Sequence, residues 1–258
     1  MNRLAQLFNN KKDKDILSIY FTAGYPHLNS TLDIAEELEK AGADFLEIGF
    51  PYSDPLADGP VIQHSSQVAL DNGMSLKVLF EQLKDLRKRV QIPILLMGYV
   101  NPMIQYGVKE FCKAAAEVGV DGVIVPDLPL SEYEEMYKED FINNGLSNIF
   151  LVTPQTSEER IRKIDSLSEG FIYLLSSSST TGKDLNVSDE IGAYYQRVKD
   201  MNLRNPLVIG FGISDQKSFE RANKYAAGAI VGSAFVKTLK DKSNDLSHIP
   251  TFIKSIKG

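Results

Sequence analysis

Two carboxylates lie in and shortly after one apolar segment of the chain, in a setting that suits proton transfer. Glu47 lies inside the run 45–49, FLEIG, and Asp58 follows eleven residues later in a loop rich in proline and glycine. A carboxyl group buried in an apolar strand loses its water, and this loss raises its pKa towards neutral pH. Two carboxyl groups in different surroundings can then take different protonation roles. The pattern favours acid–base catalysis; the alternative is structural, with Glu47 paired to a basic residue and Asp58 capping a turn.

Glycines in the second half of the chain indicate a site for an anion. Gly182, Gly212 and Gly232 each lie in the segment after a short apolar run, and Ser233 comes directly after the last of them. Glycine lets backbone N–H groups approach an anion, and the N-terminus of a following helix adds a favourable dipole. One such segment could simply be a tight turn. Three of them at consecutive strand ends predict a phosphate site, and hence a phosphorylated small molecule as the ligand.

Other polar residues are less informative. Tyr20 and Tyr173 lie within apolar runs, and Asp127 lies at the end of another. These residues could orient a substrate, but a tyrosine in such a run is equally often a core residue with its hydroxyl paired. The three histidines are scattered, without a carboxylate or second histidine at ligand spacing, so no metal site is expected.

The elements that must position these residues follow a regular alternation of short apolar runs and polar, helix-like segments. The apolar runs are 16–21, 45–49, 94–97, 122–125, 149–152, 171–175, 207–210 and 229–231. The helix-like segments are 31–41, 76–90, 109–118, 132–143, 158–166, 189–200, 215–226 and 233–240. Strands that are apolar on both faces and separated by helices indicate a buried parallel sheet.

Eight such units in 258 residues match a (β/α)8 TIM barrel, an α/β fold of roughly this length. We therefore expect one domain over residues 1–258, with an extra N-terminal helix at 1–10 over the barrel floor and a terminal helix at 246–256. A doubly wound open sheet is the structural alternative. In a barrel, the loops after the strands carry the active site, so both carboxylates and all three glycine segments would meet at one end.

Composition narrows the function further. The chain carries 28 Lys and Arg against 34 Asp and Glu, a net charge of −6, which argues against a nucleic-acid or anionic-membrane binder. Its one cysteine, Cys112, excludes intrachain disulfides and thiolate metal clusters. No targeting or membrane segment is evident, and a cytoplasmic protein is expected.

The stretch 46–63, LEIGFPYSDPLADGPVIQ, closely resembles the signature of the tryptophan synthase alpha chain family. Shorter matches follow in the family's order along essentially the whole chain, at 21–26, 96–102, 125–129, 210–214 and 232–234. An eighteen-residue signature is highly specific. The resemblance implies retro-aldol cleavage of indole-3-glycerol phosphate to indole and D-glyceraldehyde 3-phosphate in tryptophan biosynthesis.

The resemblance also implies roles for individual residues. Glu47 would protonate the indole C3 and take the proton of the side-chain hydroxyl, while Asp58 would hold the indole N–H and stabilise the cationic indolenine tautomer. The phosphate would rest on Gly182, Gly212, Gly232 and Ser233. The indole side of the pocket, or its support, would be formed by Tyr20, Tyr99, Asp127, Tyr173 and Thr181.

By the same resemblance, indole would pass to a beta chain within an α–β–β–α heterotetramer. Pyridoxal phosphate would belong to that partner, and no cofactor or metal is assigned to this chain. The loop after the second strand is expected to be exposed and to contact the partner. Its contact residues would be Phe50, Pro51, Tyr52, Asp54 and Pro55.

Alternative functions remain at this point. The chain could be a stand-alone indole-3-glycerol-phosphate lyase that releases free indole, or a non-catalytic allosteric partner of a beta chain. The presence of both Glu47 and Asp58 argues against the second. A different phosphate-binding barrel, such as a sugar-phosphate isomerase or a phosphoribosyl enzyme of histidine synthesis, would share the glycine segments but not the stretch SDPLADGP.

Overall fold

A computed structural model describes residues 3–11, 15–176, 189–210, 212–240 and 245–258 of the chain. All strand pairs in its sheet are parallel, in the order β5-β4-β3-β2-β1-β9-β8-β7-β6. The strands are β1 (Ile16–Thr22), β2 (Phe45–Gly49), β3 (Ile94–Met97), β4 (Gly122–Ile124), β5 (Ser147–Ile149), β6 (Leu151–Val152), β7 (Ile172–Leu175), β8 (Leu207–Gly210) and β9 (Gly228–Val231).

The sheet closes into a barrel through a single residue. Its two end strands, β5 and β6, are separated only by Phe150, so they are two parts of one extended segment. The backbone carbonyl of Phe150 itself accepts a hydrogen bond from the N–H of Tyr173, next to β6. The barrel therefore has eight strand positions, each coinciding with one of the apolar runs, and the TIM-barrel prediction is confirmed.

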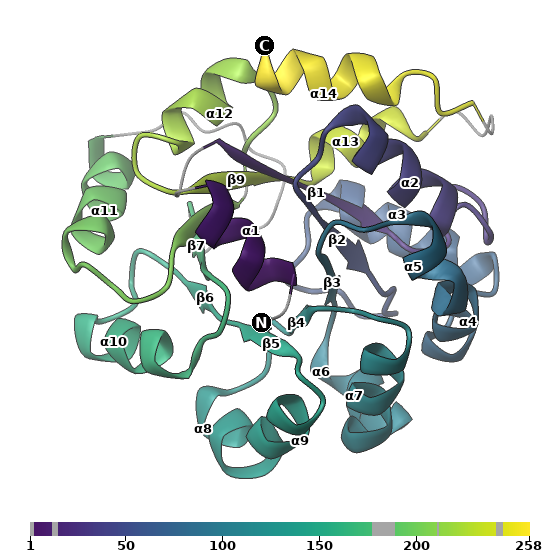
Figure 1. Cartoon of the computed structure of the whole chain (residues 1–258), viewed down its shortest axis with the longest axis horizontal. Helices are drawn as coiled ribbons and strands as arrows, with labels where there is room; N and C mark the ends of the chain where they lie inside the picture. The colour runs from purple at the N-terminus through teal and green to yellow at the C-terminus, as the bar shows by residue number, and fades with distance from the viewer. Residues whose placement is uncertain (1–2, 12–14, 177–188, 211, 241–244) are drawn as a thin grey trace.

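Helices surround the strands, and one additional helix lies across the middle of the ring (Figure 1). The helices are α1 (Arg3–Lys11), α2 (Thr31–Ala41), α3 (Pro60–Asp71), α4 (Leu76–Gln82), α5 (Leu86–Arg89), α6 (Val100–Tyr106), α7 (Val108–Glu117), α8 (Leu130–Glu132), α9 (Lys138–Asn143), α10 (Glu158–Leu167), α11 (Asp189–Asp200), α12 (Gln216–Ala222), α13 (Ser233–Thr238) and α14 (Ile249–Lys257). None of the helices in the described ranges is long and apolar enough to cross a membrane.

Two helices were not expected from the sequence. The helix α3 begins at Pro60, directly after Gly59, because proline lacks an N–H and its fixed φ suits the first turn of a helix. The helix α6 contains Asn101 and Pro102, a pair that is typical of turns. Two of the expected helices are interrupted instead: 76–90 by a 3-10 turn between α4 and α5, and 132–143 by a π turn between α8 and α9.

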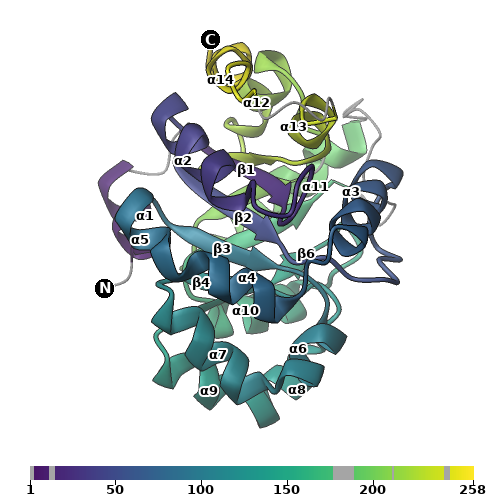
Figure 2. The ribbon, with the colours of Figure 1, turned by 90° about the vertical axis from the view of Figure 1, so that its right-hand side faces the viewer.

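The extra helix α1 closes the floor of the barrel, as predicted. Its Leu4 and Phe8 pack among interior residues near the amino ends of the strands, and the ring of Phe8 lies 5.8 Å from that of Phe171. Arg3 adds an ion pair with the buried carboxylate of Asp121. From the side, α1 and α3 lie at opposite ends of the barrel, so the floor is remote from the loop that precedes α3 (Figure 2).

Candidate active site

Glu47 points into the barrel interior because of strand alternation. Its neighbours Leu46 and Ile48 belong to the core beneath the helices, whereas Phe45, two residues earlier, belongs to the interior core. The Glu47 side chain is fully buried, and neither carboxyl oxygen has a hydrogen-bond partner among the residues that the structure describes. Burial alone raises the pKa of Glu47 to about 8. The structural alternative for Glu47 was an ion pair with a basic residue; the described residues contain no such pair.

Two tyrosines share the interior with this carboxyl group. Tyr20 on β1 is the register partner of Glu47 on β2, and Tyr173 projects inward from β7. The pKa of each hydroxyl is raised, first by burial and further by the nearby carboxylates, including Glu47. Both rings depend on glycine at the strand ends: a Cβ on Gly49 would overlap the hydroxyl of Tyr20, and one on Gly210 would overlap that of Tyr173.

Asp58 is held in place by Tyr99. The Tyr99 hydroxyl donates to Oδ2 of Asp58 at 3.2 Å and accepts the backbone N–H of Ala57 at 3.0 Å. Burial raises the pKa of Asp58 to about 6, and the Tyr99 hydrogen bond partly opposes that rise. Asp127 supports the same region because its Oδ1 accepts the N–H of Val100, in the first turn of α6. Near neutral pH, Asp58 is thus ionised while Glu47 keeps its proton.

A cavity of about 420 Å³ opens beside these residues. Its wall includes Tyr20, Asp58 and Tyr99, with Leu151, Thr153, Thr156 and Arg160 on the β6–α10 side. Glu47 is not on this wall; its register partner Tyr20 is. The described lining is therefore largely apolar and aromatic, with two charged side chains, Asp58 and Arg160. The carboxyl group of Glu47, whose pKa is raised, lies on the strand beside it.

Two of the three glycine segments, those with Gly212 and Gly232, lie at the same end of the barrel. Gly212 has φ +76°, in the left-handed region that favours glycine, and Gly232 with Ser233 begins α13. Because β8 and β9 are neighbours, the segments that follow them are adjacent. A Cβ on Gly232 would lie 3.7 Å from Cβ of Tyr20, which brings this segment next to the cavity wall. Thr181 and Gly182 lie outside the described residues.

The expectation of an exposed loop after β2 is wrong for Phe50 and Pro51, which are both buried. The Phe50 ring lies over Gly98, where a Cβ would collide with it, and packs 5.9 Å from the ring of Phe111. A phenylalanine directly after a core strand is drawn inward because burying its ring removes a large apolar surface from water.

The rest of this loop is more open. Asp54 is exposed, Tyr52 and Pro55 are partly exposed, and the Tyr52 hydroxyl accepts a hydrogen bond from Asn101 at 3.0 Å. Sequence reasoning missed Leu56, which is 85% exposed on the rim of the cavity. The available signal was a leucine within a turn of proline and aspartate, where no strand or helix can bury it.

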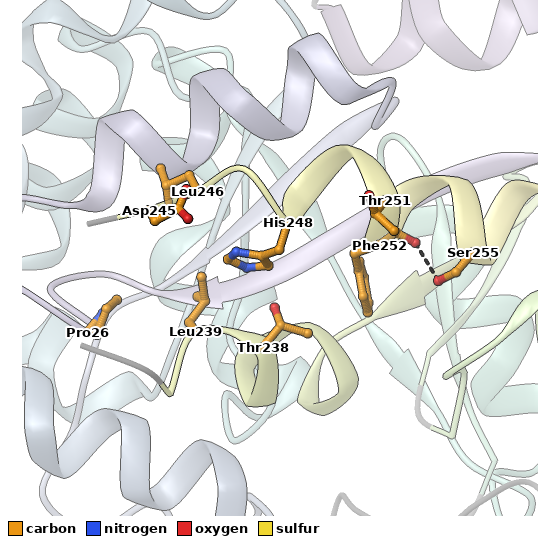
Figure 3. A pocket seen from close by; sticks show the side chains of 9 residues that line it. All are labelled: Pro26, Thr238, Leu239, Asp245, Leu246, His248, Thr251, Phe252 and Ser255. Carbon is orange, nitrogen blue, oxygen red and sulfur yellow. Dashed lines mark hydrogen bonds between the residues drawn. The ribbon is translucent and has the colours of Figure 1, made fainter. Parts of the chain in front are cut away.

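A second hollow, of about 560 Å³, lies between α13, α14 and the loop after β1, away from both carboxylates (Figure 3). Its lining includes Leu239, His248 and Phe252, and its carboxylate, Asp245, accepts the N–H of Ser247. Neither Glu47 nor Asp58 lines this hollow. In the described ranges, no three His, Cys, Asp or Glu side chains gather in a way that could hold a metal ion.

Comparison with known sequences gives a consistent result. The family model described as Tryptophan synthase alpha chain matches residues 6–254. The tryptophan synthase alpha chain of Flavobacterium psychrophilum is 56% identical over 256 residues, covering 99% of this chain and 100% of that protein. The tryptophan synthase alpha chain of Christiangramia forsetii is 53% identical over 258 residues, covering 100% of this chain and 99% of that protein.

Comparison with solved structures leads to the same family as the sequence comparison. Tryptophan synthase subunit alpha from Legionella pneumophila superposes with a TM-score of 0.90 at 33% identity, covering 100% of this chain and 97% of that one. A chain of Mycobacterium tuberculosis tryptophan synthase in an aminoacrylate-bound form has a TM-score of 0.86 at 27% identity, with coverage of 100% and 98%.

Proposed function

The chain belongs to the tryptophan synthase alpha chain family, which cleaves indole-3-glycerol phosphate in tryptophan biosynthesis, and we propose that Glu47 and Asp58 carry out this cleavage. The activity is that of a carbon–carbon lyase. One observation carries the residue assignment. Among the described residues, the fully buried carboxyl group of Glu47 has no hydrogen-bond partner and a raised pKa, whereas Asp58, at the same end of the barrel, is ionised.

Glu47 would act first as an acid and then as a base. Its protonated form donates to C3 of the indole ring, which becomes a cationic indolenine. The carboxylate then takes the proton of the substrate's side-chain hydroxyl. As that hydroxyl becomes an aldehyde, the electron pair of the breaking carbon–carbon bond returns to the ring. Glu47 ends protonated, as it began, which fits a group whose pKa is about 8.

Asp58 would stabilise the charged intermediate. As a carboxylate it accepts the indole N–H, and its negative charge offsets the positive charge of the indolenine. Tyr99 would position this carboxylate through the hydrogen bond to Oδ2. Tyr20, Tyr173 and Asp127 would shape or support the indole side of the site, together with Thr181.

The phosphate of the substrate would bind the backbone N–H groups around Gly212, Gly232 and Ser233, with Gly182 added from the segment after β7. Two neighbouring loops and the start of α13 support this assignment. The proposal assigns no cofactor to this chain and needs none, because the protonated indole ring itself accepts the electron pair.

The family implies a beta chain as the partner, which would receive the indole and would hold pyridoxal phosphate. We propose an α–β–β–α assembly acting in the cytoplasm. The contact would use the exposed part of the loop after β2, namely Tyr52, Asp54 and Pro55 with Leu56, while the buried Phe50 and Pro51 would support that loop from below.

Indole release from indole-3-glycerol phosphate tests this proposal, with the purified chain alone and with a beta chain added. We expect slow release that rises sharply with the partner. Glu47→Gln should lower kcat at least about a hundredfold, since general acid–base catalysis contributes 10²–10⁴-fold. Asp54→Asn, an exposed carboxylate of the same region, is the matched control and should leave the isolated chain's rate unchanged.

The other outcomes are distinct. Normal turnover by Glu47→Gln would remove Glu47 from its role. Fast release of indole by the wild-type chain, at a rate that the beta chain does not change, would identify a stand-alone lyase. Circular dichroism and beta-chain binding of the variant would separate a loss of chemistry from a loss of folding.

A further inference from the structure

Arg160 is unusual among the arginines of the chain. Most of them have a hydrogen-bond or ionic partner; these are Arg3, Arg87, Arg89, Arg197, Arg204 and Arg221. In the part of the chain that the structure describes, the side chains of Arg160 and Arg162 have none. Both side chains are exposed, but they differ in position: Arg160 lines the cavity that contains Asp58, whereas Arg162, on the same helix, does not.

The backbone position of Arg160 disfavours a cation. Arg160 is the third residue of α10, and its own N–H is bound by the side chain of Ser157, the residue that caps the helix. The N-terminus of a helix carries partial positive charge, so a guanidinium in the first turn is electrostatically unfavourable. The preceding acids, Glu158 and Glu159, are one and two residues away and do not face it along the helix.

The charges that line the cavity indicate a role for Arg160. Of the described residues that line it, only Asp58 and Arg160 carry charge at neutral pH. Asp58 repels an anion, and the whole chain carries a net charge of −6. The substrate of the proposed reaction is neutral at its indole and glycerol parts and doubly negative at its phosphate. A lone cation on the cavity wall therefore has one obvious counter-charge in that substrate.

We propose that Arg160, on the wall of this cavity, attracts the phosphate of indole-3-glycerol phosphate and strengthens binding of the substrate through space. This inference rests on the proposed function and adds to it a residue that selects the anionic ligand. Arg160 is not placed at the reacting atoms. The final phosphate contacts remain the backbone groups around Gly212, Gly232 and Ser233, and the guanidinium offsets the repulsion from Asp58.

The experiment compares an anionic and a neutral product as inhibitors of the wild-type chain and three variants. In Arg160→Gln, at low ionic strength, the inhibition constant of D-glyceraldehyde 3-phosphate and the KM of the substrate should rise about three- to fivefold, the upper range for a single solvent-exposed charge interaction. Binding of neutral indole and kcat should not change. The effect should shrink below about twofold at 0.5 M salt, where the screening length is only a few ångströms.

Two further variants separate charge from shape and location. Arg160→Lys should retain most of the anion affinity. Arg162→Gln removes the same charge from the same helix, outside the cavity, and should behave as wild type. The inference is overturned if Arg160→Gln and Arg162→Gln are indistinguishable. It is also overturned if Arg160→Gln weakens only the association with a beta chain, which would make Arg160 a partner contact. Failure of the proposed function is a separate result: the wild-type chain itself would then not cleave the substrate.

Discussion

Two carboxyl groups of the same chemical type differ here because their surroundings differ. Glu47 is enclosed by strands and receives no hydrogen bond from the described residues, so burial alone sets the direction of its pKa shift. Asp58 lies on a loop and receives a hydrogen bond from Tyr99, which favours its charged form. The sequence predicted both residues, because a glutamate within FLEIG and an aspartate in a proline-rich loop are each visible in it. The donor to Asp58 lies 41 residues away along the chain, and only the structure shows that contact.

The Tyr99 hydroxyl should control the acid limb of the pH–rate profile. It stabilises the charged form of Asp58, so Tyr99→Phe should raise the pKa of Asp58 above its value of about 6. Activity that requires the carboxylate would then be lost at a higher pH as the solution is acidified. The kcat/KM profile between pH 5 and 8 measures this shift. Tyr52→Phe is the control, because the Tyr52 hydroxyl bonds to Asn101; an unmoved limb in Tyr99→Phe would contradict the assignment.

Glu47 should make the folded chain less stable at high pH. Its pKa is about 8 in the folded state against an ordinary value of 4.5, so the folded state retains its proton more strongly. The stabilisation that this provides is complete below pH 4.5 and is lost as the pH rises through 8. Relative to Glu47→Gln, the wild-type free energy of unfolding should fall by on the order of 4 kcal/mol between pH 4 and 9. Urea unfolding at several pH values measures it, and a constant difference between the two proteins would count against a buried, neutral Glu47.

Glycines at the strand ends make room for the rings of the site. Gly49, Gly98 and Gly210 leave space for Tyr20, Phe50 and Tyr173, respectively. Helix ends follow local residue types only in part: Gly42 ends α2 with φ +100°, and the Ser157 side chain caps α10. A serine also precedes α2, but the Ser30 hydroxyl donates to backbone carbonyls of the preceding loop and does not cap the helix. A cap depends on side-chain rotamer as well as on residue type, and neighbouring turns compete for the same hydroxyl.

Gly98→Ala should destabilise the chain by about 1–3 kcal/mol, since the new methyl group would collide with the Phe50 ring in a packed core. The urea midpoint measures the loss. A smaller side chain at the other position should relieve the collision, so Gly98→Ala combined with Phe50→Leu should cost less than the sum of the two single changes. Simple additivity in this cycle would show that the two sites do not touch.

At the scale of the whole molecule, the barrel separates stability from chemistry. The floor is closed by Leu4 and Phe8 of α1, whereas Asp58, the cavity and the segments with Gly212 and Gly232 follow the carboxyl ends of the strands. The helix α1 and the helix α3, which follows the Asp58 loop, lie at opposite ends of the barrel (Figure 2). Substitutions at the floor should therefore alter the unfolding free energy without altering the reaction.

Leu4→Ala tests this separation. The Leu4 side chain is fully buried, so its truncation should lower the free energy of unfolding by about 2–4 kcal/mol. The rate of indole release, measured well below the melting temperature, should remain that of wild type. Leu7→Ala, on the partly buried side of the same helix, should cost less. A lower rate in Leu4→Ala at full folding would mean that floor and site are coupled.

The sequence by itself determined the barrel, the two carboxylates and the family. These depend on local information: the alternation of apolar runs and helices, and a signature within one continuous stretch. The tertiary structure decided what depends on residues far apart in the chain. Packing against Gly98 buries Phe50, the Tyr99 hydroxyl reaches Asp58, and barrel closure brings Arg160 into the same cavity as that carboxylate. Residue type and spacing along the sequence do not specify the distances between residues on separate strands, because the packing of the whole barrel sets those distances.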